Sequence, residues 1–125
     1  MDIAVEKRES LLIVRLVGRL DLGAVPGLQE AMLPVATPGA QVLIDLGGLS
    51  FIGSSGLRVF LGALKVTRRA PGGDVRLAAL QAPVQEVFTI SGLTQAFRIF
   101  PTVDAAIASF APAATPGTKT AITLP

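Results

Sequence analysis

A short apolar run followed closely by an amphipathic one constrains the fold of this chain more than any other feature. Residues 42–44 form a continuous Val-Leu-Ile run, which is typical of a strand covered on both faces. A second run has apolar residues at helical spacing: Leu57, Phe60, Leu61, Leu64. A Gly/Ser-rich segment separates the two runs. We therefore predict a buried strand over 41–46, a loop over 48–55 and a helix over 55–70.

Two hydroxyl side chains, Ser54 and Ser55, lie where this predicted helix begins. The N-terminus of a helix carries unpaired N–H groups and a partial positive charge. A serine at this place can cap the helix. A serine there can also accept a phosphoryl group, because the new negative charge would lie against free N–H donors.

Composition excludes several classes of function. The chain of 125 residues has no His and no Cys, so a Ser-His-Asp triad, a Cys nucleophile and the usual zinc ligand sets are impossible. A net charge of +2, with six Phe and neither Trp nor Tyr, argues against direct nucleic-acid binding. No apolar run is long enough to span a bilayer, and the N-terminal residues lack the basic start and long apolar core expected of a signal peptide. We expect a cytoplasmic protein that is not inserted in a membrane, is not an enzyme, and needs no metal or cofactor.

The remaining patterns predict a domain in which strands and helices alternate. Strands are predicted over 2–7, 11–17, 74–80 and 96–100; helices are predicted over 24–35, from Pro83 to about Ser91, and after a cap at Thr102. The first two strands form an antiparallel hairpin, so the fold class is α/β, or α+β, with a mixed sheet. The domain is predicted to span 1–110. Residues 111–125, rich in Pro and Thr, are predicted to form a mobile tail.

The segment from Asp45 to Leu57 resembles the signature of STAS domains, the family of anti-sigma factor antagonists and sulfate transporter tails. That signature runs strand-Asp-Leu-x-x-Leu/Val-x-Phe-Ile/Met-Asp-Ser-Ser-Gly-Leu, followed by a helix. The chain departs from it at Gly53, where the family usually has Asp. It matches at the following positions: Asp45, Leu46, Leu49, Phe51, Ile52, Ser54, Ser55, Gly56, Leu57.

The resemblance implies four or five strands, with four helices mainly on one face. It also implies that Ser54 is the target of a partner kinase, with Ser55 as the second choice. Ser55 would then be the likelier cap of the helix. Asp21 can be a cap or a turn residue, but the resemblance places it beside the loop of the phosphorylated serine. For Asp45 a structural role is favoured over a partner contact. The partner-binding residues implied are Asp21, Asp45, Gly53, Ser54, Ser55, Gly56, Leu57 and Arg58.

The function implied is that of an anti-sigma factor antagonist, a monomer or weak dimer that binds an anti-sigma factor with serine kinase activity. Phosphorylation would switch the protein off, and a phosphoserine phosphatase would reverse the switch. The alternative, raised by Gly53, is a STAS scaffold or accessory subunit of a stress-signalling complex or a lipid-transport ATPase, without phosphorylation. A small-ligand site in the Gly/Ser turn is disfavoured, because this turn lacks the Lys of a P-loop.

Overall fold

The computed structural model describes residues 1–110, and the tail predicted over 111–125 lies outside them. The elements in chain order are β1 (Asp2–Arg8), β2 (Leu11–Leu20), the 3₁₀ helix η1 (Leu22–Ala24), α1 (Val25–Met32), β3 (Gln41–Ile52), α2 (Ser54–Thr67), β4 (Asp74–Ala78), α3 (Ala82–Ser91), the 3₁₀ helix η2 (Leu93–Gln95), β5 (Arg98–Phe100) and α4 (Val103–Ser109).

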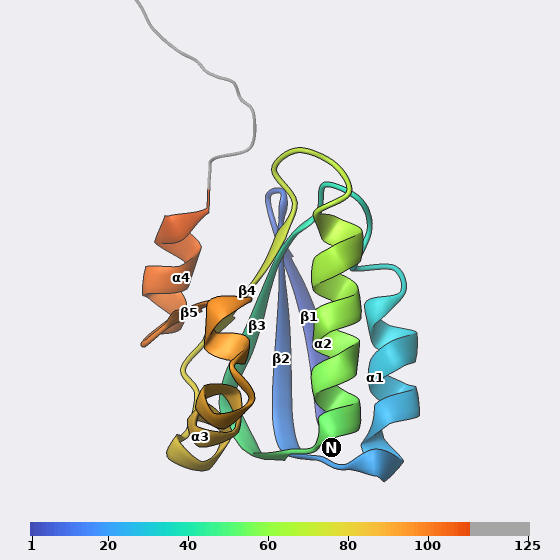
Figure 1. The fold of residues 1–125 in the computed structure, drawn as a ribbon. Coiled ribbons are helices and arrows are strands. Elements are labelled where there is room, and N and C mark those ends of the chain that lie inside the picture. The colour runs from blue at the N-terminus through green and yellow to red at the C-terminus, as the bar shows by residue number, and fades with distance from the viewer. Residues whose placement is uncertain (111–125) are drawn as a thin grey trace, which may run out of the picture.

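The five strands form one sheet in the order β1-β2-β3-β4-β5, as Figure 1 shows. β1 and β2 are antiparallel, and every later neighbour is added in parallel. The connection in the hairpin is only Glu9 and Ser10, and Glu9 adopts a φ of 58° to close it. The predicted mixed sheet that opens on a hairpin is confirmed.

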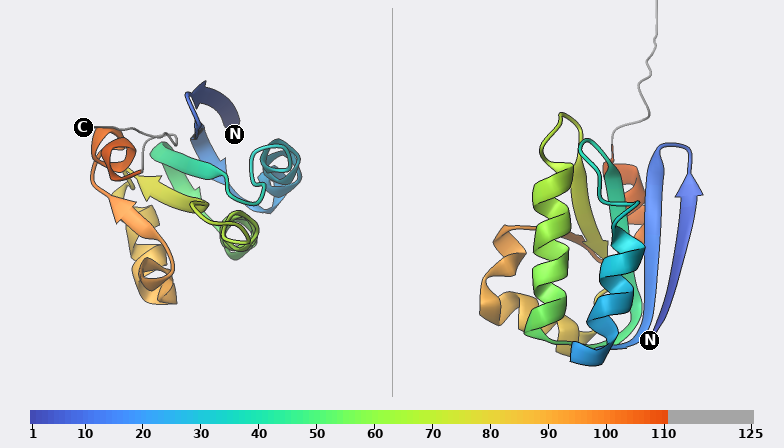
Figure 2. Two further views of the ribbon diagram at one scale, coloured as in Figure 1. Left: turned by 90° about the horizontal axis from the view of Figure 1, so that it is seen from above. Right: turned by 90° about the vertical axis from the view of Figure 1, so that its right-hand side faces the viewer.

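The helices cover the two faces of the sheet unequally (Figure 2). α1, α2 and α3 pack on one face, where their buried residues join those of β2, β3 and β4 in the main core. α4 packs on the opposite face, where Ala106 and Phe110 meet Leu11, Ile13 and Leu43 in a second, smaller core. The expectation that the helices lie mainly on one face is therefore confirmed, with α4 as the exception.

The strand β3 is twice as long as predicted, and the predicted loop over 48–55 is wrong for most of its length. Residues 47–52 continue the strand, and only Gly53 separates it from α2. The register with β2 shifts twice here, so two extra residues of β3 are accommodated as bulges. Gly48 pairs with Val17, and a Cβ atom at this glycine would lie 2.8 Å from Val17 Cγ2. The glycines that suggest a turn in the sequence instead allow close pairing of two strands.

Other boundaries differ from the predictions by a few residues. α2 ends at Thr67 rather than at 70, and the buried Thr67 hydroxyl donates a hydrogen bond to the carbonyl of Leu64. β4 ends at Ala78, because Ala79 has a φ of 63° that a strand does not accommodate. α1 is shorter than the predicted 24–35, and β5 is shorter than the predicted 96–100.

Two predicted helix ends are confirmed. Gly92 adopts a left-handed conformation with φ of 77° after α3, as expected of a C-terminal glycine. The Thr102 side chain caps α4 by accepting a hydrogen bond from the N–H of Ala105 at 3.1 Å.

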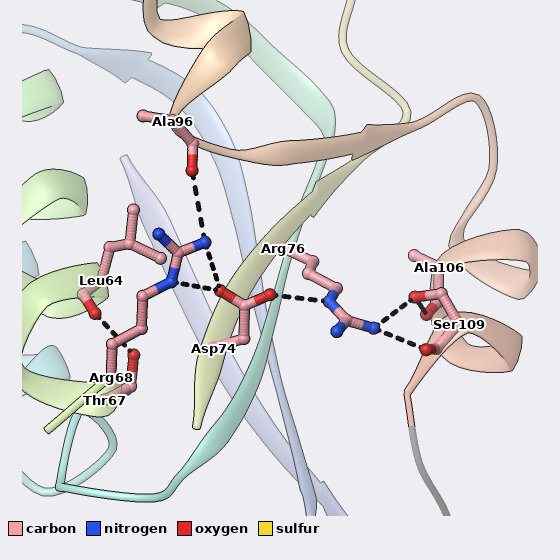
Figure 3. Close-up of polar contacts among 8 residues, drawn as sticks. All are labelled: Leu64, Thr67, Arg68, Asp74, Arg76, Ala96, Ala106 and Ser109. Carbon is pink, nitrogen blue, oxygen red and sulfur yellow. Dashed lines mark hydrogen bonds and ion pairs between the residues drawn. The ribbon is translucent and has the colours of Figure 1, made fainter. Parts of the chain in front are cut away.

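An ion-pair network ties α2, β4 and α4 together at the end of the sheet where β4 begins (Figure 3). Asp74 accepts hydrogen bonds from Arg68 Nε at 3.1 Å and from Arg76 Nε at 2.8 Å. Arg76 also donates to the carbonyl and the hydroxyl oxygens of Ser109, at 2.6 and 2.9 Å. Because these residues come from three elements, the network holds α4 on its face of the sheet.

Candidate functional site

The carboxyl ends of β2 and β3 bring two distant segments of the chain together. Leu20 and Ile52 are paired in the sheet, and the N–H of Gly53 donates a hydrogen bond to the carbonyl of Leu20 at 3.0 Å. Asp21 and Gly53 are the residues that directly follow this pair. The site is at the lower end of the sheet in Figure 1, where α1 and α2 both begin. In sheets of parallel strands, binding sites occur preferentially beyond the carboxyl ends of the strands.

Asp21 is held by the start of the first helical segment. Its Oδ1 accepts a hydrogen bond from the N–H of Ala24 at 3.1 Å, so the carboxylate caps η1. The residue is exposed, and a capped carboxylate still has lone pairs for other donors. The capping role considered for Asp21 and its position beside the Ser54 segment are therefore both present in the structure.

The two serines lie in the first turn of α2, but neither caps it. Gly53 occupies the capping position and offers no side chain, so the expectation that Ser55 caps the helix is wrong. The first N–H of α2 that is paired within the described chain belongs to Leu57, which donates to the carbonyl of Gly53 at 3.1 Å. Within residues 1–110, the hydroxyls of Ser54 and Ser55 make no hydrogen bond. Ser54 is exposed and Ser55 is half-buried, so Ser54 is the more accessible nucleophile.

The two residues that follow the serines are buried. Gly56 packs against Leu20, and Leu57 is only 8% exposed within the main core. Both residues were predicted among the partner-binding residues, but both are buried and so do not form part of the surface. They could influence partner binding only indirectly, by fixing where α2 packs on the sheet. Arg58, one residue further on, is exposed.

Asp45 lies apart from the other predicted residues. Its Oδ2 pairs with Arg15 Nε at 3.0 Å, and its Oδ1 accepts a hydrogen bond from the N–H of Gly47, also at 3.0 Å. Asp45 and Gly53 are eight residue steps apart, a distance of roughly 26 Å along a strand. The structure therefore gives Asp45 contacts within the sheet and does not bring it to the Ser54 segment.

Two residues beside Ser54 were missed by the sequence analysis. The guanidinium carbon of Arg19 lies 4.4 Å from the centre of the Phe51 ring, within the range of a cation–π contact. Phe51 is 37% exposed, and its ring would be 3.7 Å from a Cβ atom on Gly53. Arg19 and Phe51 are paired in the sheet directly after the second register shift, and both are exposed. Because this bulge breaks the alternation of faces, so that Ser50 and Phe51 are both exposed, no local sequence pattern points to these two residues.

Within the described part of the chain, neither a metal site nor a membrane-spanning helix is found. Within residues 1–110, no group of three or more acidic side chains could hold a metal ion. None of the helices there is long and apolar enough to cross a membrane.

Comparisons with known proteins agree on one family. The family model of the STAS domain matches residues 2–106. The anti-sigma-B factor antagonist of Bacillus subtilis is 32% identical over 93 residues, which cover 74% of this chain and 84% of the relative. In a crystal structure, an anti-sigma factor antagonist from Mycobacterium paratuberculosis has the same fold, with a TM-score of 0.78 at 22% identity, covering 87% of this chain and 92% of the other.

The structures of SpoIIAA, an anti-sigma factor antagonist from Bacillus, are also similar. The unphosphorylated form gives a TM-score of 0.72 at 27% identity, covering 85% of this chain and 93% of SpoIIAA. The phosphorylated form gives a TM-score of 0.66 at 25% identity, covering 86% and 97% of the two chains.

Proposed function

The chain belongs to the STAS domain family, and from this premise we propose that it is an anti-sigma factor antagonist switched by phosphorylation of Ser54. The unmodified protein binds an anti-sigma factor with serine kinase activity and so releases the sigma factor. The kinase then modifies Ser54 and loses its affinity for the product. In this role the domain is a binding partner and a phosphate acceptor.

The observation that carries the proposal is the exposed hydroxyl of Ser54 at an uncapped helix N-terminus. The N–H groups of Ser54, Ser55 and Gly56 have no partner within residues 1–110, because Gly53 has no capping side chain. These donors and the helix dipole favour an anion at this place. A phosphoserine therefore fits here without a change of fold. The similarity of the chain to both forms of SpoIIAA supports this point.

The reaction is a transfer of the γ-phosphoryl group of ATP to Ser54 Oγ. The bond from the γ-phosphorus to the bridging oxygen breaks, ADP leaves, and a base on the kinase takes the hydroxyl proton. The product carries about −1.5 to −2 additional charge at neutral pH. Asp21 follows Leu20, the strand partner of Ile52, so the phosphate adds to a carboxylate at the same end of the sheet and repels an acidic partner surface. A phosphatase that hydrolyses the ester would restore binding.

The proposed partner surface consists of exposed residues around Ser54. Asp21, Gly53 and Arg58 border it, and the Arg19–Phe51 pair extends it along β3. An aromatic ring and an arginine on an exposed surface are typical of residues that dominate binding energy at interfaces. Asp45 belongs to this proposal only as a residue that shapes the sheet.

The experiment is phosphorylation by the partner itself. The anti-sigma factor is isolated by capture on this protein from native lysate, identified, purified, and incubated with ATP and the wild-type protein, Ser54→Ala or Ser55→Ala. Mass spectrometry should locate one phosphate on Ser54 in the wild type and in Ser55→Ala, and none in Ser54→Ala. Phosphate on Ser55 alone would overturn the choice of serine.

A second candidate function is a STAS scaffold or accessory subunit that binds partners without being phosphorylated. The observation in its favour is Gly53, which stands where the family usually has Asp. Stable binding of the partner kinase in the presence of ATP, with no phosphate on either serine, would favour this function over the switch.

A further inference from the structure

A groove of about 690 Å³ runs between α1 and α2 on the face of the sheet that the two helices cover. On the α2 side it extends from Ser55 to Val66, a length of about 16 Å or three helical turns. On the α1 side it extends from Leu22 to Ala36. Most of the lining side chains are apolar, and Arg58 is the one charged residue among those described that line it.

The walls of the groove expose apolar surface where a partner could reach it. Leu22 and Leu33, on the α1 side, are 75% and 76% exposed. In the middle of the α2 side, Gly62 leaves a gap, since a Cβ atom there would have nothing within 4 Å. Large apolar side chains beside an open groove are a mark of a binding surface.

The outer side of α2 adds a row of positive charge to one edge of this groove. Arg58 and Lys65 lie seven residues apart in α2, which is about two helical turns, so they project from the same side of the helix. We call these two residues the basic ridge. Neither of them takes part in an ion pair within residues 1–110, and α2 contains no acidic residue. The charges of the ridge are therefore available to an acidic partner.

We propose that this groove binds an amphipathic α-helix of a partner protein, with apolar residues in the groove and acidic residues facing the basic ridge. Binding of a helix in an apolar groove uses side chains spaced three and four residues apart, and three turns can hold such a set. The proposal goes beyond the Ser54 switch, because its occupant is a helix held by the apolar groove along α2, although Arg58 borders both surfaces.

The test uses the full chain and two designed helical peptides of about 18 residues. Both carry the same row of Leu, and along one edge one peptide has Glu where the other has Lys. Fluorescence anisotropy should show that the acidic peptide binds at least about tenfold more tightly than the basic one. Lys65→Glu should weaken binding of the acidic peptide about fivefold and strengthen binding of the basic one.

A matched pair of glycine variants tests the groove itself. Gly62→Leu places a side chain in the groove and should weaken binding of the acidic peptide at least about tenfold. Gly27→Leu is the control, because Gly27 is an exposed residue of α1 that does not line the groove and also has nothing within 4 Å. This control should bind the peptide as the wild type does. Leu favours a helix over Gly, so both variants should fold, which circular dichroism verifies.

Several results would overturn the proposal. Equal binding of the two peptides, no binding of either, or undiminished binding by Gly62→Leu would each do so. A dimer seen by sedimentation and abolished by Gly62→Leu would make a second copy of the chain the occupant. Binding to phosphatidylglycerol vesicles that is lost in Gly62→Leu, without binding of the acidic peptide, would assign the groove to a lipid surface.

Discussion

The side chain of Leu20 fills the space that a Cβ atom on Gly56 would need. Such an atom would lie 2.6 Å from both Cγ and Cδ2 of Leu20, which is too close for any real contact. Leu20 ends β2, and Gly56 is in the first turn of α2. The fit between these two residues therefore sets how closely the Ser54 segment approaches the strand that leads to Asp21.

Gly56→Ala should destabilise the domain because the added methyl group must displace the buried Leu20 side chain. We expect a loss of about 1–3 kcal/mol in the free energy of unfolding, measured by urea denaturation. Gly62→Ala is the matched control, since it lies in the same helix and its Cβ meets open space. That variant should gain up to about 1 kcal/mol from helix propensity. Equal stabilities of the two variants would mean that a methyl group at position 56 does not clash with Leu20.

Asp74→Asn should lower the stability of the domain and loosen the attachment of α4 to the sheet. The carboxylate joins Arg76, which is 14% exposed, to Arg68, which is 48% exposed and contributes less because water screens it. We expect a loss of about 1–3 kcal/mol of unfolding free energy, since Arg76 would lose a charged partner.

The control for this variant is Asp45→Asn, which breaks a single pair with the half-exposed Arg15. Its loss should be smaller. Hydrogen exchange followed by NMR should also show faster exchange in α4 for Asp74→Asn and not for Asp45→Asn. Unchanged exchange in α4 in both variants would mean that the network is not what holds this helix.

Ser54→Asp should leave the domain folded and reduce binding of the anti-sigma factor. Ser54 is exposed, and a carboxylate in the first turn of a helix is favourable by about 0.3–1 kcal/mol. The negative charge next to Asp21 mimics part of the charge of the phosphoserine. Calorimetry with the purified partner should show weaker binding, while Ser54→Ala binds as the wild type does. Tight binding by Ser54→Asp, with circular dichroism of a folded protein, would argue against a charge-based switch.

Gly53→Asp should be tolerated and should slightly stabilise α2. Gly53 has a φ of −96° and a ψ of 171°, an extended conformation that any residue adopts. A Cβ atom there would make only ordinary contacts, the nearest at 3.7 Å from Phe51 Cε2. Because an Asp at this capping position can accept a hydrogen bond from the first turn, we expect a gain of a few tenths of a kcal/mol. Thermal unfolding measures this gain, and a lower melting temperature would contradict it.

The same variant also tests the meaning of this departure from the family signature. If the family Asp assists presentation of the serine, Gly53→Asp should be phosphorylated faster than the wild type by the partner kinase. Initial rates measured side by side decide the point. Equal rates would mean that Gly53 is neutral for the switch.

Local patterns were enough to predict the order of the elements and much of the core. The Val-Leu-Ile run, the helical spacing of Leu57, Phe60 and Leu64, and the Thr102 cap are all encoded within a few residues and are present as predicted. The resemblance to STAS domains rests on one continuous segment, so it too could be recognised without coordinates. These features depend on contacts between near neighbours in the chain.

The length of β3 could not be predicted in the same way. Gly47 and Gly48 predict a turn when only their neighbours are considered, because glycine is a weak strand former. Pairing with residues about 30 positions earlier overrides this preference, since Gly48 makes room for Val17 and the bulges absorb the extra residues. The error also hid Phe51 and its contact with Arg19.

The sequence by itself determined the chemistry available at the site: a pair of hydroxyls at a helix start, no His, no Cys and a glycine before the serines. Only the tertiary structure decided which of these groups are accessible and what surrounds them. Parallel pairing of β2 with β3 places Asp21 beside Gly53, and the Leu20–Gly56 fit buries the residues after Ser55. The physical reason is that such contacts join residues more than 30 positions apart, so their strength depends on the packing of whole elements and not on local preference.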